Sequence, residues 1–200
     1  MARRKQYEYY RDKLLTFTEG VEYKKLSEIT LLTAGDRITK SMMRDDFEYP
    51  VMSSGAQSSG NYNDYNYSHS VAIPRVGAAG LVNWIENKFW ATDDCFVCSQ
   101  KSDEVDIKYI YYFLKTKQSV LQSKIYGGTF PKLKKDYLWS LPIPIPPREI
   151  QNKIVATLDH FDKLCNDLTQ GLPAEINARR KQYEYYRDIL LTFKPREPTA

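Results

Sequence analysis

The sequence predicts an α+β fold, made of one mixed α/β domain and long helices that form coiled coils. Three observations lead to this prediction. One helical segment occurs twice, a further amphipathic helix precedes the later copy, and the stretch between the copies mixes strand-like and helix-like patterns. The chain has 200 residues, and the 42% that are hydrophobic suffice for the core of one ordinary domain.

The duplicated segment is the most informative feature of the chain. Residues 2–17 and 178–193 agree at fifteen of sixteen positions, and the single difference is Lys13 against Ile189. Their separation of 176 residues is too long for a solenoid, whose repeats recur every 20 to 50 residues or so. We therefore interpret the chain as one period of a two-period protein, in which the segment that closes one unit also opens the next.

Each copy carries large apolar side chains at spacings of three and four, which predicts a helix with one apolar seam. In the first copy these side chains are Tyr7, Tyr10, Leu14 and Phe17. A helix packed on the core of its own domain is one explanation of such a seam. Two nearly identical copies favour pairing with another helix or another chain, because one core seldom offers two identical slots.

A long amphipathic helix is predicted to start at Arg148 or Glu149 and to be interrupted at Gly171 before the second copy. The seam that we expect to contact a partner helix or a second chain consists of Ile154, Leu158, Phe161, Leu168, Tyr183, Tyr186, Leu190 and Phe193. The predicted division is a partial helical region at 1–17, a globular domain at 18–147, two helices at 148–193 and a tail at 194–200.

Charge is unevenly distributed in the globular region. Residues 18–147 contain fifteen basic and fifteen acidic residues, yet residues 107–135 contain seven lysines and no acid. Such a run predicts a phosphate-contacting surface, although a solvated helix face is the alternative. Most of it is assigned to a helix over about 104–124, capped by Asp103, with its lysines pointing outward. The proline-rich residues 139–147 are expected to form an edge strand or an extended connector.

Two further stretches have the chemistry to contact nucleic-acid bases. Residues 53–67 form the longest predicted loop and combine small residues with Asn and Tyr, which can follow a base edge or stack on a base. An ordinary tyrosine-rich surface loop is the alternative. Arg75 stands beside a turn formed by Gly77 and Gly80, where it can pair with guanine or phosphate, or form a salt bridge.

The sequence offers no catalytic site, metal site or cofactor motif. No glycine is followed by lysine, G-x-G-x-x-G is missing, and the two histidines lie far apart. Cys95 and Cys98 are expected to be buried free thiols, because residues three apart in a strand face opposite sides. A basic N-terminus without an apolar segment, and the absence of an apolar run of about 18 residues, predict a cytoplasmic protein without a membrane span.

The order of the short motifs YPVMSSG, IPRVGAAG, ATDDCFV, GGTFPKL and LPIPIPPREIQNKI resembles the specificity subunits of type I restriction-modification systems. The resemblance covers nearly the whole chain and is strongest at 127–133 and 141–158. Complete members of that family have two target recognition domains and two conserved helical regions. This chain has one target recognition domain, at 18–147, and therefore resembles a half-subunit.

The resemblance implies a non-catalytic DNA reader without a cofactor of its own. It would form a homodimer through its helices, read a bipartite inverted repeat in double-stranded DNA, and position the modification (adenine methyltransferase) and restriction subunits. We expect base or groove contacts from Ser54, Gln57, Asn61, Tyr62 and Arg75, and phosphate contacts from Lys132, Lys134 and Lys135. A helical scaffold that reads no DNA, and the recognition half of a type IIG-like enzyme, are the alternatives.

Overall fold

The computed structural model describes residues 2–18, 20–127, 132–166 and 172–191 of the chain. The helices are α1 Ala2–Leu14, α2 Leu26–Ile29, α3 Ile107–Thr116, α4 Gln118–Ser123, α5 Lys135–Trp139, α6 Arg148–Asn166 and α7 Leu172–Leu191, with a 3-10 helix η1 at Lys40–Met42. The strands are β1 Glu22–Lys25, β2 Thr30–Ala34, β3 Tyr49–Met52, β4 Asn61–Tyr62, β5 Ser70–Pro74, β6 Asn83–Ile85, β7 Trp90–Ala91, β8 Cys95–Gln100, β9 Ile125–Tyr126, β10 Lys132–Leu133 and β11 Pro142–Ile145. This mixture confirms the predicted α+β fold.

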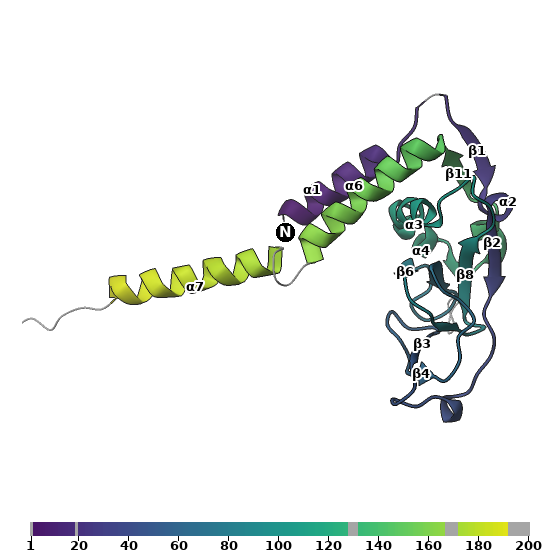
Figure 1. The fold of residues 1–200 in the computed structure, drawn as a ribbon, viewed down its shortest axis with the longest axis horizontal. Helices are drawn as coiled ribbons and strands as arrows, with labels where there is room; N and C mark the ends of the chain where they lie inside the picture. The colour runs from purple at the N-terminus through teal and green to yellow at the C-terminus, as the bar shows by residue number, and fades with distance from the viewer. Residues whose placement is uncertain (1, 19, 128–131, 167–171, 192–200) are drawn as a thin grey trace, which may run out of the picture.

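The largest sheet is antiparallel and has the strand order β2-β8-β5-β6. A smaller sheet, β4-β3-β7, lies at the end of the domain far from α1 and α6 (Figure 1). Two short pairs, β1 with β11 and β9 with β10, complete the strands. Since β1 and β11 are the first and last strands, their pairing brings both ends of the globular region together. The predicted domain boundaries stay a prediction.

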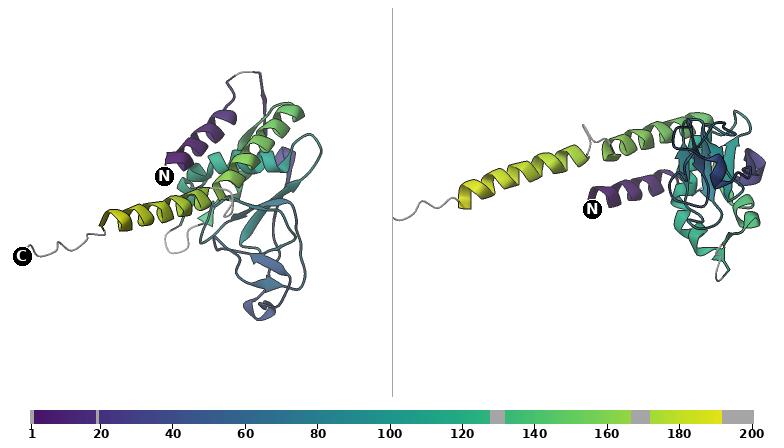
Figure 2. Two further views of the ribbon diagram at one scale, coloured as in Figure 1. Left: turned by 60° about the vertical axis from the view of Figure 1, so that its left-hand side comes forward. Right: turned by 90° about the horizontal axis from the view of Figure 1, so that it is seen from below.

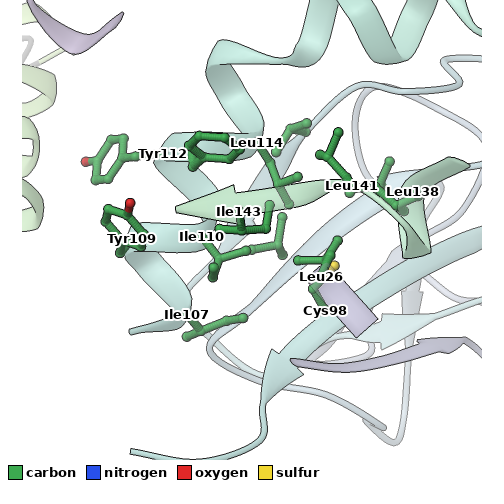
Figure 3. Close-up of a cluster of buried hydrophobic side chains, with 14 of the residues drawn as sticks. Leu26, Cys98, Ile107, Tyr109, Ile110, Tyr112, Leu114, Leu138, Leu141 and Ile143 are labelled. Carbon is green, nitrogen blue, oxygen red and sulfur yellow. The ribbon is translucent and has the colours of Figure 1, made fainter. Parts of the chain in front are cut away.

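The main hydrophobic core lies between α3 and the largest sheet. Figure 3 shows side chains of α3 gathered with Leu26, Cys98 and Ile143, which come from segments far apart in the sequence. Among its largest fully buried side chains are Tyr109, Tyr112, Leu26, Ile73, Ile110, Leu114, Leu121, Leu138, Ile143 and Leu158. Burial of each such side chain contributes about 1.5–3 kcal/mol relative to exposure.

The two cysteines of β8 confirm the expected burial. Both thiols are free and buried, and they lie in different clusters: Cys98 packs in the main core, whereas Cys95 packs with Met52, Phe89 and Val97 in a second, smaller core. This follows from the alternation of side chains along a strand. Burial raises the pKa of the Cys95 thiol to about 12, so the group stays protonated at neutral pH.

The helix predicted over 104–124 was only partly right. The structure begins it at Ile107, where Asp106 rather than Asp103 is the N-cap and accepts a hydrogen bond from the backbone N–H of Lys108 at 2.7 Å. Lys117 separates α3 from α4. The expectation of an extended segment from residue 139 was also partly wrong, because α5 extends to Trp139. The edge-strand interpretation is confirmed for β11, which pairs with β1 alone.

Helix α6 packs on α3, and α1 lies beside α6 in both Figure 1 and Figure 2. Ile154 and Leu158 of α6 are buried in the main core, and Phe161 contacts Tyr7 of α1 with 6.4 Å between ring centres. Within one chain the seam of α6 thus packs on α3 and α1; its contact with a second chain stays a prediction. The apolar side chains of α6 that pack on α3 shield it from solvent.

The first repeat copy also departs from its predicted seam. Helix α1 ends at Leu14, three residues before the predicted end, and Tyr10 and Leu14 are exposed. Tyr7 and Phe17 of the predicted seam pack against the core, together with Leu15, which the prediction did not include. Helix α7 extends away from the domain (Figure 1). Its Tyr183 and Tyr186 side chains are exposed. Two further seam residues, Leu168 and Phe193, lie outside the described residues, as does the side chain of Leu190.

None of the helices in the described ranges has both the length and the apolar composition needed to cross a lipid bilayer.

Candidate nucleic-acid interface

The polar loop after β3 is fastened to the glycine turn after β5. The backbone carbonyl of Ser54 accepts a hydrogen bond from the N–H of Ala78 at 2.8 Å. Gly77 has φ 64°, and a Cβ built there would lie 2.6 Å from the carbonyl oxygen of Ser54. Only glycine combines this backbone conformation with so close an approach. The two loops that sequence analysis selected separately thus form one surface.

Arg75 is held in place by backbone groups. Its N–H donates to the carbonyl of Asp94 at 2.8 Å, and its guanidinium donates to the carbonyl of Asp93 at 3.4 Å and lies 5.6 Å from the ring centre of Phe96. Within the described part of the chain no carboxylate forms an ion pair with Arg75. The described residues therefore do not support the salt-bridge alternative for Arg75.

The lysines after the glycine-rich segment lie next to Arg75. The N–H of Leu133 donates to the carbonyl of Arg75 at 2.8 Å, and Lys132 forms a β-bridge with Val76. The rings of Phe96 and Trp139 meet edge to face, with 5.1 Å between their centres, and the Lys135 ammonium lies 5.0 Å from the Trp139 ring centre. Arg75 and Lys135 thus lie at opposite ends of one aromatic pair.

We call this surface the basic face, and its members are Arg75, Lys132, Lys134, Lys135 and Trp139; Phe96, which contacts Arg75 and Trp139, is itself buried in the main core. The Lys134 ammonium lies 4.8 Å from the ring centre of Tyr126. A cation over an aromatic face gains about 0.5–1 kcal/mol at an exposed site, which limits how far these side chains swing. The basic face therefore combines positive charge that can neutralise phosphate with one partly exposed ring, that of Trp139.

The run of seven lysines is not one continuous surface, contrary to expectation. The Lys108 ammonium donates to the carboxylate of Asp159 at 2.9 Å, and that of Lys115 donates to the carbonyl of Val82 at 2.9 Å. The sequence could not indicate this, because Asp159 is fifty-one residues away on α6. Only the members of the run at 132–135 take part in the basic face.

A second cluster of aromatic rings surrounds Tyr62 at the smaller sheet. Tyr62 meets Trp90 edge to face at 4.8 Å, Tyr49 lies 5.1 Å from Tyr65, and the Lys88 ammonium lies 4.2 Å from the Tyr65 ring centre. A hydrogen bond with Tyr65 raises the pKa of Lys88, so this ammonium stays charged. Sequence analysis missed Lys88 and Trp90; the run Lys88-Phe89-Trp90, a cation beside two rings, was the available signal.

The other two candidate residues have different surroundings. The side-chain amide of Asn61 donates to the carbonyl of Asp45 at 3.2 Å, and so fastens the turn before β3. Gln57 is exposed and lines an open cavity of about 430 Å³ with Trp84, Tyr111 and Lys115. The structure thus brings together Ser54, Arg75 and the three lysines, joins Tyr62 to the aromatic cluster, and places Gln57 in a separate hollow.

The described residues contain no cluster of three or more His, Cys, Asp or Glu side chains suited to a metal ion. The molecule is thus an α+β domain carried on helices, with a basic, aromatic surface on the domain. Residues 18–178 match the family described as "Type I restriction modification DNA specificity domain". The chain belongs to this family, which confirms the predicted resemblance.

Curated relatives agree with this assignment. A type I restriction enzyme specificity subunit from Mycoplasma pneumoniae is 31% identical over 96% of this chain and 62% of its own. The specificity subunit of a type I restriction enzyme from Escherichia coli is 34% identical over 99% of this chain and 55% of its own. The chain thus spans little more than half the length of these two relatives.

A solved structure supports the fold. The crystal structure of a type I restriction-modification S subunit from M. genitalium superposes with a TM-score of 0.68 at 21% identity, covering 86% of this chain and 46% of that one. The superposition therefore spans somewhat less than half of that subunit.

Proposed function

We propose that this chain is the non-catalytic DNA-reading component of a type I restriction-modification system. In this proposal the target recognition domain contacts double-stranded DNA through the basic face, with Ser54 and Arg75 toward the bases and Lys132, Lys134 and Lys135 toward phosphates. The observation that best supports this proposal is that Arg75 lies beside Phe96 and Lys135 beside Trp139, with the two rings in contact. The chain also belongs to a family of DNA specificity domains.

We further propose that two copies associate through their helices. Helices of 19 and 20 residues are about 28 to 30 Å long at 1.5 Å per residue, close to the roughly 34 Å of one DNA turn. A twofold dimer presents two identical domains in inverted orientation, and so reads a bipartite inverted repeat. The dimer in turn positions a modification subunit, an adenine methyltransferase, and a restriction subunit at that site.

The decisive experiment expresses the chain with the modification subunit of its own genome in a host that lacks DNA methylation. Long-read sequencing then maps methylated adenines. We expect one motif whose two halves are inverted copies separated by an unspecified spacer. Assembly of the complex without any methylated motif would contradict the proposal.

Charge reversal separates DNA reading from a purely scaffolding role. Changing Lys132, Lys134 and Lys135 to Glu should abolish methylation of the motif while the complex still assembles. Reversal of three exposed lysines on the helices, Lys13, Lys153 and Lys163, is the matched control because it changes the net charge equally. If both triple variants methylated the motif as well as the wild type does, the result would favour a scaffold that reads no DNA.

A further inference from the structure

The two repeat copies have the same sequence but different surroundings. In α1, Tyr7 is half-buried and Arg11 has 12% of its side-chain surface exposed. Their counterparts on α7 are Tyr183, with 67% of its surface exposed, and Arg187, with 46% of its side chain exposed. Both arginines keep the same 2.7 Å ion pair with the following aspartate. The difference is therefore one of tertiary contact, not of helix structure.

The surface that receives α1 is formed by α6 and α3, and we call it the docking surface. It contains Phe161, whose ring lies 6.4 Å from that of Tyr7, and Asp162. Burial, followed by a hydrogen bond with Asp162, raises the pKa of the Tyr7 hydroxyl. At the other end of the helix Leu15 is inserted into the main core and only 4% exposed. The docking surface thus contacts the ring and the hydroxyl group of Tyr7 and the aliphatic side chain of Leu15.

The docking surface cannot distinguish the two copies by their sequences. Every residue by which α1 contacts it recurs in the second copy, with Tyr183 for Tyr7 and Leu191 for Leu15. The single difference, Lys13 against Ile189, falls on a side chain that points to solvent in α1. A segment with the sequence of residues 178–191 therefore fits wherever α1 fits.

We propose that α7 of a second copy of this chain docks on the α3–α6 surface in place of α1, and that α1 is an internal competitor for that surface. Reciprocal exchange between two copies closes a twofold dimer in which both docking surfaces stay filled. The inference rests on the proposed dimerisation and names its contact surface and its regulation.

Competition sets the strength of this association. Helix α1 is joined to β1 by a short connection, so its effective concentration at the docking surface is on the order of millimolar. The exchange replaces one helix by a nearly identical one, so the free energy of docking is almost the same before and after it. The balance between closed monomer and exchanged dimer is therefore sensitive to a single side chain in either copy.

The test substitutes the same residue type in the two copies, in the full-length chain. Tyr7→Glu weakens the internal competitor and should tighten the dimer by about tenfold, since roughly 1.4 kcal/mol of lost competition corresponds to that factor. Tyr183→Glu weakens the incoming helix and should loosen the dimer by at least about the same factor. Sedimentation equilibrium gives both dissociation constants, and circular dichroism checks that each variant is folded.

A proximity measurement supplements the binding constants. One chain carries Phe161→Cys, a second carries Tyr183→Cys, and both carry Cys165→Ser; a short bis-maleimide should join the two different chains. Cys95 and Cys98 are buried and do not interfere. The linkage should become more frequent with Tyr7→Glu in the Phe161→Cys chain.

The outcomes discriminate the two proposals. Shifts of the same sign for Tyr7→Glu and Tyr183→Glu, or no linkage between chains, would overturn the exchange. An inverted-repeat methylation motif together with such a result leaves the DNA-reading proposal intact and requires another dimer contact. Opposite shifts without any methylated motif establish the exchange and refute the DNA-reading proposal.

Discussion

Gly77 lies where the polar loop meets the glycine turn, and two physical constraints act on it at once. Its φ of 64° is costly for other residues, and an added Cβ would lie 2.6 Å from the carbonyl oxygen of Ser54. Gly20 is the natural comparison, since its φ is 75° but an added Cβ there would have no atom within 4 Å.

We expect Gly77→Ala to lower the free energy of unfolding by about 2–4 kcal/mol, the sum of backbone strain and overpacking. Gly20→Ala should cost only the strain, about 1–2 kcal/mol. Urea denaturation of both variants measures the difference. Equal losses would mean that the loop yields freely to the new methyl group, and that it is not fastened at Ser54.

The lysines of the basic face give a second prediction at this scale. If each contacts one phosphate, replacing Lys132, Lys134 and Lys135 by Ala should reduce the slope of log K against log salt by roughly 2 to 3, at about 0.9 per contact. Fluorescence anisotropy with a DNA duplex at several salt concentrations measures the slope. Alanine at Lys13, Lys153 and Lys163 should leave it unchanged; a drop of equal size there would point to unspecific attraction.

Residue chemistry was predictable to the extent that it is local. The glycine turn and the buried thiols follow from short sequence patterns, and the structure agrees on both. The role of Arg75 stays a prediction. The use of the Asn61 amide to hold the carbonyl of Asp45 was not predictable, because nothing in the sequence says which of two polar groups meets the other.

At the scale of elements, one hydroxyl group of α3 meets two carboxylates of α6. The Tyr112 hydroxyl donates to Asp159 at 2.5 Å and lies 3.0 Å from a carboxylate oxygen of Asp162. Burial, followed by the hydrogen bond to Asp159, raises the pKa of Tyr112 well above its usual value of 10. The folded protein therefore keeps this proton at a pH where the unfolded chain loses it.

The consequence is a stability contribution that is fully present below pH 10 or so and decreases above it. We expect Tyr112→Phe to lower the free energy of unfolding by about 1–3 kcal/mol at pH 8, through the lost charge-assisted hydrogen bonds. Between about pH 10 and 11 the wild type should lose up to roughly 1.4 kcal/mol more per pH unit than the variant. Urea unfolding at each pH tests this, and parallel pH curves would contradict it.

The start of α3 illustrates why element boundaries were only partly predictable. Asp103 and Asp106 are equally good capping residues, and the choice is made by distant groups. Gln151 of α6 accepts a hydrogen bond from the N–H of Asp106 at 2.9 Å, and Gln100 accepts one from the N–H of Ile107 at 3.2 Å. The helical pattern itself was strong enough to predict that a helix exists there.

At the scale of the whole molecule, the length of the helices should determine the distance between the two half-sites. Seven residues inserted near Ala178 at the start of the second copy lengthen α7 by about 10 Å and keep its apolar residues in register over two turns. The spacer of the methylated motif should then grow by up to about three base pairs, at 3.4 Å each. Sequencing of the methylated motif checks this; an unchanged spacer would mean that α7 does not separate the domains.

The pairing of β1 with β11 has a consequence for how such a protein changes over time. Because these strands lie side by side, the chain enters and leaves the globular region at one edge. The segment between Leu26 and Leu141 is then an insertion that starts and ends at two neighbouring strands. Genetic exchange with break points in β1 and β11 can replace that insertion as a unit, provided that the incoming α3 still packs on α6. New binding preferences can then arise in a single recombination event.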